Sequence, residues 1–304
     1  MNVVLKHVLA IIFGALALGL LIGTQPSKAL EQLKVYRGVL VLEGTIVAGD
    51  YDKLRTFFGT KSNFDKISGG VFLASPGGNI AEAMKIGRLI RALRLSTDAP
   101  SGTRSGTPRF GESLITPNHL IDSRTHYLCA SACFLVYVSG VYRHLNWVGR
   151  LGVHRPTLAE GNAKALSVDN ALNLTWRVRD TVKLYLEEMD VPNKYVDLIY
   201  SIPPNAIRWV TQSEFDSDLQ GFVPEMRDWV GAECNPRTNE EKIPSTDSRT
   251  KSPPPENARA TENKTIFSMR ADQSSDIVKC WMRAKTELST EAWHKVFLGQ
   301  VAAP

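Results

Sequence analysis

The chain has 304 residues, of which 43% are hydrophobic and 22% charged, the balance of a folded protein with a substantial core. Its formal net charge is +5, but lysines and arginines are scattered, so we expect no nucleic-acid-binding arm. The cysteines lack the C-x-x-C spacing of a zinc or redox site, and we expect neither a metal nor a cofactor.

Residues 1–29 have the pattern of an export signal. Lys6 and His7 precede an apolar run over residues 8–22, and Ser27-Lys28-Ala29 resembles a signal cleavage site. The apolar run is shorter than a spanning helix prefers, so a cleaved signal is favoured over an uncleaved membrane anchor. The sequence therefore predicts a periplasmic or secreted protein that contacts the membrane only through an uncleaved N-terminal segment.

Export would permit disulfides. Cys234 and Cys280 flank a polar, Pro-rich stretch, and pairing them would tie the C-terminal segment to the body. Cys129 and Cys133 could also pair, and the alternative for both pairs is that the cysteines are small packing residues.

The body of the chain, residues 30–234, alternates apolar runs with amphipathic segments, which predicts an α/β domain. Periodicity predicts strands and helices in chain order as follows: strand 39–42, helix 49–58, strand 70–74, helix 79–94, a buried helix after Ser131, strand 151–153, helix 167–189, helix 195–199, strand 207–211, helix 212–219 and strand 221–223. We expect a long surface loop over 96–124 and a disordered linker over 235–265. Residues 266–304 should form a short, appended C-terminal helix.

Two stretches can supply hydrogen bonds to a reacting oxygen. In Ser75-Pro76-Gly77-Gly78, two glycines join a buried strand to a helix and leave backbone amides unpaired. In Ala130-Ser131-Ala132, a single serine precedes a buried helix, whose first amide could stabilise an oxyanion. An ordinary glycine turn and a tightly packed serine are the alternatives.

A histidine that could act as a base follows the next predicted strand. His154 ends the strand at 151–153, in His154-Arg155-Pro156, where it would face a cleft. The strand-SPGG-helix, the small-residue serine turn and the histidine strand occur in this order. Together they resemble the Clp peptidase branch of the ClpP/crotonase superfamily, and in particular exported bacterial Clp-like proteins with cysteines around the serine.

The resemblance covers about residues 39–223 and implies a fold of stacked ββα units. It implies that Ser131 is the nucleophile and His154 its general base, with the amides of Gly78 and Ala132 as the oxyanion hole. This division of roles is chemically sound, because a serine hydroxyl is a poor nucleophile until an imidazole takes its proton.

The third catalytic residue is where the sequence departs from the family. The family's aspartate precedes a run matched here by Arg208-Trp209-Val210-Thr211, but no carboxylate occurs among the three residues before this run. Asn205 could orient the imidazole, and Asp197 is the other candidate. A Ser/Lys dyad would need a lysine at a matching position, which the sequence does not offer.

The favoured prediction is an exported serine hydrolase, most simply a peptidase, acting on a peptide or protein. Partnership with an ATP-driven unfoldase is not expected, and a homo-oligomer is left open. One rival is an acyl-CoA enzyme of the crotonase branch, which export disfavours because CoA is cytosolic. The other rival is a non-catalytic envelope binding protein that retains the fold.

Overall fold

The computed structural model describes residues 30, 33–68, 70–99, 115–117, 128–145, 150–157, 167–234 and 271–299. The predicted export signal (1–29) and the predicted linker (235–265) lie outside the described residues. Within the described ranges, no helix is both long enough and apolar enough to cross a membrane.

The larger sheet has the strand order β1-β2-β3-β4-β7-β10. Its four central strands run parallel, and the two edge strands are antiparallel to their neighbours. The bounds are β1 (Lys34–Tyr36), β2 (Val39–Glu43), β3 (Gly70–Ala74), β4 (Thr97–Ala99), β7 (Tyr142–Leu145) and β10 (Gly221–Phe222). Because parallel strands end at one edge of a sheet, the loops after β2 and β3 lie close together.

A smaller sheet has the order β5-β9-β8-β6, with β6 and β8 parallel. Its strands are β5 (Ile115–Pro117), β6 (Cys129–Ala130), β8 (Leu151–Val153) and β9 (Ala206–Trp209). The two sheets meet where Ser75, just after β3, pairs with Cys129. The Ser75 amide donates to the Leu128 carbonyl at 2.8 Å, and the Ala130 amide donates to the Ser75 carbonyl at 3.0 Å. This contact brings the end of β3 to the start of the serine segment.

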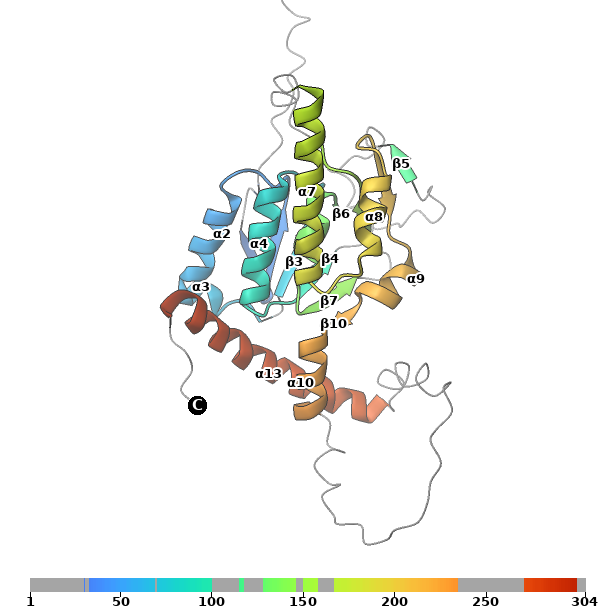
Figure 1. Cartoon of the computed structure of the whole chain (residues 1–304). Helices are drawn as coiled ribbons and strands as arrows, with labels where there is room; N and C mark the ends of the chain where they lie inside the picture. The colour runs from blue at the N-terminus through green and yellow to red at the C-terminus, as the bar shows by residue number, and fades with distance from the viewer. Residues whose placement is uncertain are drawn as a thin grey trace, which may run out of the picture.

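Helices cover the larger sheet on one side, with α2, α4 and α7 lying next to one another (Figure 1). The bounds are α2 (Asp50–Gly59), α3 (Lys61–Phe64), α4 (Ile80–Ala92), α5 (Ala132–Tyr137), α7 (Val168–Glu188), α8 (Lys194–Ser201), α9 (Gln212–Glu214), α10 (Pro224–Cys234) and α13 (Ala271–Leu298). A π-helical turn, Phe215–Leu219, continues α9.

The helix α5 lies in the centre of the core, and all six of its residues are buried. The Tyr185 hydroxyl of α7 donates to the Leu135 carbonyl at 2.8 Å. The Phe134 ring stacks on the Tyr195 ring of α8, with 5.9 Å between centroids. The helix that begins after Ser131 is therefore held by packing on several sides.

The C-terminal helix α13 lies within the predicted segment 266–304, and it packs on the body of the protein. Trp293 is buried in the main core and donates from Nε1 to the Phe58 carbonyl at 2.6 Å. Trp281 packs edge-on against Phe222 in a second apolar cluster. The helical periodicity of this segment is weak, but its two buried tryptophans pack it against the body of the protein.

The predicted loop over 96–124 is wrong in part, since Thr97–Ala99 and Ile115–Pro117 are strands. The three residues of β4 carry no apolar run, and their strand conformation comes from pairing with both neighbours. The strand β7 was not predicted either, because its inward-facing Arg143 is only 4% exposed and breaks the apolar pattern. One of its terminal nitrogens donates to the Met189 carbonyl. The α/β class itself is confirmed.

Candidate active site

The serine turn (residues 129–133) connects β6 to α5 and holds Ser131 in an unusual backbone conformation. Ser131 has φ 57° and ψ −125°, a region that a residue with a side chain rarely adopts. The Ser131 amide donates to the Gly152 carbonyl at 2.9 Å, and its carbonyl accepts from Phe134 at 3.0 Å. A sharp strand-to-helix turn of this kind presents a hydroxyl at the head of a helix.

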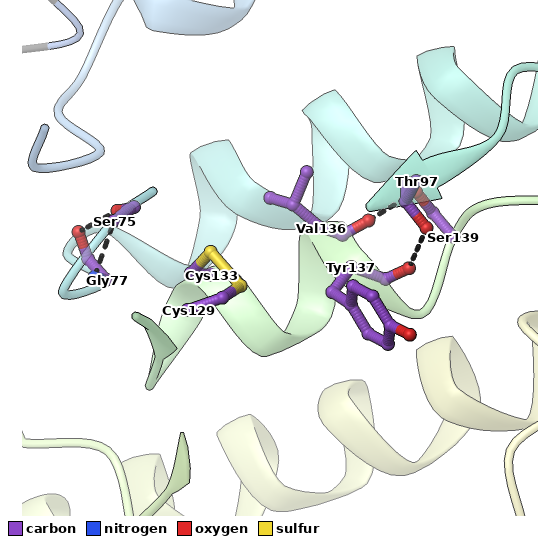
Figure 2. The surroundings of a disulfide bond; sticks show 8 residues. All are labelled: Ser75, Gly77, Thr97, Cys129, Cys133, Val136, Tyr137 and Ser139. Atoms are coloured by element: carbon purple, nitrogen blue, oxygen red, sulfur yellow. Dashed lines mark hydrogen bonds between the residues drawn. A yellow bond between two sulfur atoms is a disulfide. The ribbon is translucent and has the colours of Figure 1, made fainter. Parts of the chain in front are cut away.

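Two pairs of cysteines lie at disulfide distance, Cys129 with Cys133 and Cys234 with Cys280. The first pair spans the serine turn: Cys129 is in β6, Cys133 is in the first turn of α5, and both are fully buried (Figure 2). The second pair joins α10 to α13. Both pairings that the sequence left open are thus present, and the first fixes the strand and helix on either side of Ser131.

The glycine loop (residues 75–78) packs directly on the serine turn. A Cβ on Gly77 would lie 2.6 Å from the Ser131 Cβ and 2.9 Å from the Ala132 nitrogen. Gly77 also has φ +103°, so a side chain is excluded both by conformation and by space. Its amide donates to the Ser75 Oγ at 3.0 Å, which closes the loop (Figure 2).

The Gly78 amide is oriented by a parallel bridge to Ile46. The Ile46 amide donates to the Gly77 carbonyl and the Asn79 amide donates to the Ile46 carbonyl, both at 2.8 Å. In such a bridge, the N–H of the residue between the two bonds points to the opposite side. The Gly78 N–H therefore points away from Ile46. The amide of Ala132, the first residue of α5, has no partner within its helix.

His154 comes beside Ser131 because β6 and β8 are parallel and Ala130 is in register with Gly152. Its Nδ1 lies 2.9 Å from the carbonyl oxygen of Arg155. A carbonyl only accepts, so Nδ1 carries the proton and Nε2 keeps its lone pair. Burial lowers the pKa of His154 below its ordinary value, and the bond to Arg155 offsets this only in part. The direction of this shift favours the neutral imidazole.

One small cavity collects the reactive groups. Ser131, Ala132 and His154 all line it, and its volume is about 20 Å³. Its other walls are apolar and come from four helices and the end of β8. These lining residues are Ile80, Phe134, Leu135, Val153, Pro156, Val182 and Ile199. Apart from Ser131, the Ala132 backbone and His154, a ligand would meet only apolar side chains here.

The structure describes both candidates for a third catalytic residue. Asn205 is exposed in the turn between α8 and β9. The Asp197 side chain is 76% exposed and forms an ion pair with Arg179 at 2.9 Å. Within the part of the chain that the structure describes, no hydrogen bond joins His154 to either side chain. The Arg155 carbonyl accepts from Nδ1 instead. Such a backbone acceptor cannot be predicted from residue types in the sequence.

Metal ligands are also missing from the described ranges, where no group of three or more His, Cys, Asp and Glu side chains could hold an ion. The buried Lys285 Nζ contacts the Ser96 Oγ at 2.7 Å, on a different part of the fold from the serine turn. Burial lowers the pKa of Lys285 to about 8.

No family model matches this chain. No curated protein matches it either. Among solved structures, a ClpP1 mutant from Listeria monocytogenes aligns with 11% identity and a TM-score of 0.37, covering 59% of this chain and 86% of that one. A mutant of the 1510-N membrane-bound stomatin-specific protease aligns with 14% identity and a TM-score of 0.39, covering 64% of this chain and 83% of that one. Similarities at this level do not define a site or a substrate.

Proposed function

We propose that the chain is an exported serine hydrolase of ClpP/crotonase-like fold, most simply a peptidase, in which Ser131 is the nucleophile and His154 the general base. The observation that carries this proposal is that Ser131, with its positive φ, and the half-buried His154 line one cavity. Two disulfides suit an oxidising compartment, in agreement with export.

The chemistry begins with proton transfer from the Ser131 Oγ to the His154 Nε2 as Oγ attacks the substrate carbonyl carbon. The carbonyl oxygen becomes an oxyanion, and the amides of Gly78 and Ala132 donate to it. Each such donor contributes about 3 kcal/mol to the stability of the transition state. The imidazolium then gives its proton to the leaving amine, and water hydrolyses the acyl-enzyme by the reverse sequence.

The Arg155 carbonyl takes the orienting role that Asn205 or Asp197 was predicted to fill. It accepts from Nδ1 and so fixes both the tautomer and the plane of the ring. A neutral carbonyl stabilises the imidazolium less than a carboxylate does, so we expect slower turnover than in an enzyme with an aspartate at this place. The apolar walls favour a peptide or protein substrate with an uncharged side chain beside the scissile bond.

The second candidate is a non-catalytic binding protein of the same fold. The observation that favours it is that the group on the His154 Nδ1 is a backbone carbonyl rather than a carboxylate. A binding protein would retain the cavity and would not react with a mechanism-based probe.

A fluorophosphonate probe separates the two candidates. We expect the oxidised wild-type protein to be labelled, Ser131→Ala to be unlabelled, and His154→Ala to be labelled at least about 100-fold more slowly. Ser201→Ala is the matched control, because this serine on α8 is exposed, donates to the Leu198 carbonyl and does not line the cavity. Unlabelled wild-type protein with a native circular dichroism spectrum would exclude the hydrolase.

A further inference from the structure

A buried carboxylate lies behind the glycine loop, outside the cavity. Glu82, in the first turn of α4, is only 6% exposed. Its Oε2 accepts from the amides of Gly49 at 3.2 Å and Tyr51 at 3.0 Å, and Lys85 Nζ donates to its Oε1 at 2.9 Å. The side chain therefore joins the start of α4 to the start of α2.

A second carboxylate acts on the same turn from the other helix. Asp50 is 1% exposed, and its Oδ2 accepts from the Val47 amide at 2.7 Å. Lys53 Nζ donates to its other oxygen at 2.9 Å. The carboxylates of Glu82 and Asp50 together satisfy three amides of residues 47–51. We call this segment the clamped turn.

The clamped turn follows Ile46 directly, and Ile46 holds the glycine loop. Its amide and carbonyl bond Gly77 and Asn79, on either side of Gly78. A Cβ on Gly78 would lie only 2.1 Å from the Ile46 oxygen, so the two backbones touch with no spare room. A shift of the clamped turn would therefore move Gly78.

We propose that Glu82 is a positioning residue that holds the Gly78 amide in place through the clamped turn and Ile46. The proposal rests on the proposed function, in which that amide binds the oxyanion. The path is short: Glu82 fixes the Gly49 and Tyr51 amides, the turn fixes Ile46, and Ile46 fixes the backbone around Gly78. Asn79, which follows Gly78 in the chain, caps the same helix, since its Oδ1 accepts from the Glu82 amide at 3.1 Å.

Packing between α2 and α4 does not require this carboxylate. Leu54 and Phe58 of α2 and Ile86 and Ile90 of α4 are buried in the common core. A buried carboxylate is costly unless its oxygens accept hydrogen bonds, so its presence here is explained by the amides it holds. Burial alone would raise the pKa of Glu82, but the bonds from Lys85, Tyr51 and Gly49 outweigh it, and the pKa lies below its ordinary value.

The first test is the kinetics of fluorophosphonate labelling in full-length, oxidised protein. We expect Glu82→Ala to lower the maximal inactivation rate by about 10- to 100-fold, since small misplacements at a site have effects of this size. The probe concentration for half-maximal rate should stay within about threefold, because Glu82 does not line the cavity. Glu82→Gln keeps an acceptor oxygen and should recover most of the rate.

The second test does not depend on catalysis. Hydrogen exchange of the Ile46 and Asn79 amides should be faster in Glu82→Ala than in wild type, and close to wild type in Glu82→Gln. If Glu82→Ala does not fold, Glu82→Asp serves instead, since it keeps the charge but withdraws it by one methylene. Glu188→Gln is the control. The Glu188 side chain, in the last turn of α7, is about half exposed and forms an ion pair with Arg88 of α4.

The outcomes are distinct. Wild-type protein that is never labelled would refute the proposed function, and hydrogen exchange would still decide the positioning role. A wild-type inactivation rate in folded Glu82→Ala, or unchanged exchange at Ile46 and Asn79, would overturn the positioning role alone. Equal losses of rate in Glu82→Ala and Glu188→Gln would also overturn it, because the effect would not be specific to the clamped turn.

Discussion

We expect the Cys234–Cys280 disulfide to contribute more to the stability of the fold, and the Cys129–Cys133 disulfide to contribute more to the reactivity of Ser131. Cys129 and Cys133 are 4 residues apart, whereas Cys234 and Cys280 are 46 apart. Replacing one pair by alanines leaves a protein with a single bridge. Reducing that bridge then removes the crosslink without any further amino-acid substitution.

The chain-entropy relation gives the expected sizes. Closing a loop with the longer separation stabilises the fold by about 4 kcal/mol, and closing one with the shorter separation by about 2 kcal/mol. The free energy of unfolding, measured with urea before and after reduction, should therefore fall about twice as far when Cys234–Cys280 is the remaining bridge.

Reactivity should show the reverse order. Reducing Cys129–Cys133 frees the strand and helix beside Ser131, and we expect the rate of fluorophosphonate labelling to fall about tenfold or more. Cys234 and Cys280 lie on α10 and α13, which contribute no lining residue to the cavity, so their reduction should leave the rate unchanged in folded protein. Labelling that depends more on the Cys234–Cys280 bridge would refute the role given to the serine turn.

The remaining predictions concern the glycine loop, His154 and the two candidates for a third catalytic residue. Gly77→Ala should be destabilised by about 2–3 kcal/mol more than Gly221→Ala and should lose labelling. Both glycines have positive φ, but of the two only a Cβ on Gly77 would lie within 3 Å of other atoms. Equal losses of the free energy of unfolding in urea would contradict this clash. The labelling rate should rise with pH to a plateau, with a midpoint below 6.5, because burial lowers the pKa of His154; a midpoint above 6.5 would contradict this. Below pH 6.5 the unfolded chain binds this proton before the folded chain does. As the pH is lowered, the free energy of unfolding of the wild type should therefore fall more steeply than that of His154→Gln. Asn205→Ala and Asp197→Asn should each label within about twofold of wild type, and a loss of 100-fold in either would restore that residue as the orienting group.

Local patterns in the sequence predicted the elements that carry the site. The strand Gly70–Ala74 was predicted with its observed bounds, because a buried parallel strand is apolar on both faces. The strand Leu151–Val153 and the helix after Ser131 were also predicted. Placing Ser131 and His154 in one cavity depended on family resemblance and on motif order, since the register of β6 with β8 is a long-range property.

Other features left no local signal. The carbonyl of Arg155 belongs to the backbone, so no residue type in the sequence indicates its role. Glu82 reads as an ordinary first-turn acid of a helix, and only the folded chain brings it to the amides of Gly49 and Tyr51. The strand β7 lacks an apolar pattern because of the buried Arg143, whose guanidinium donates to the Met189 carbonyl, distant in sequence.

The position of a fluorophosphonate adduct on the protein decides whether Ser131 is the nucleophile. Oxidised wild-type protein is treated with the probe, digested and mapped by mass spectrometry. We expect one phosphonyl adduct, on Ser131. An adduct on Ser96, which lies 2.7 Å from the buried Lys285 amine, or no adduct at all on folded protein, would contradict it.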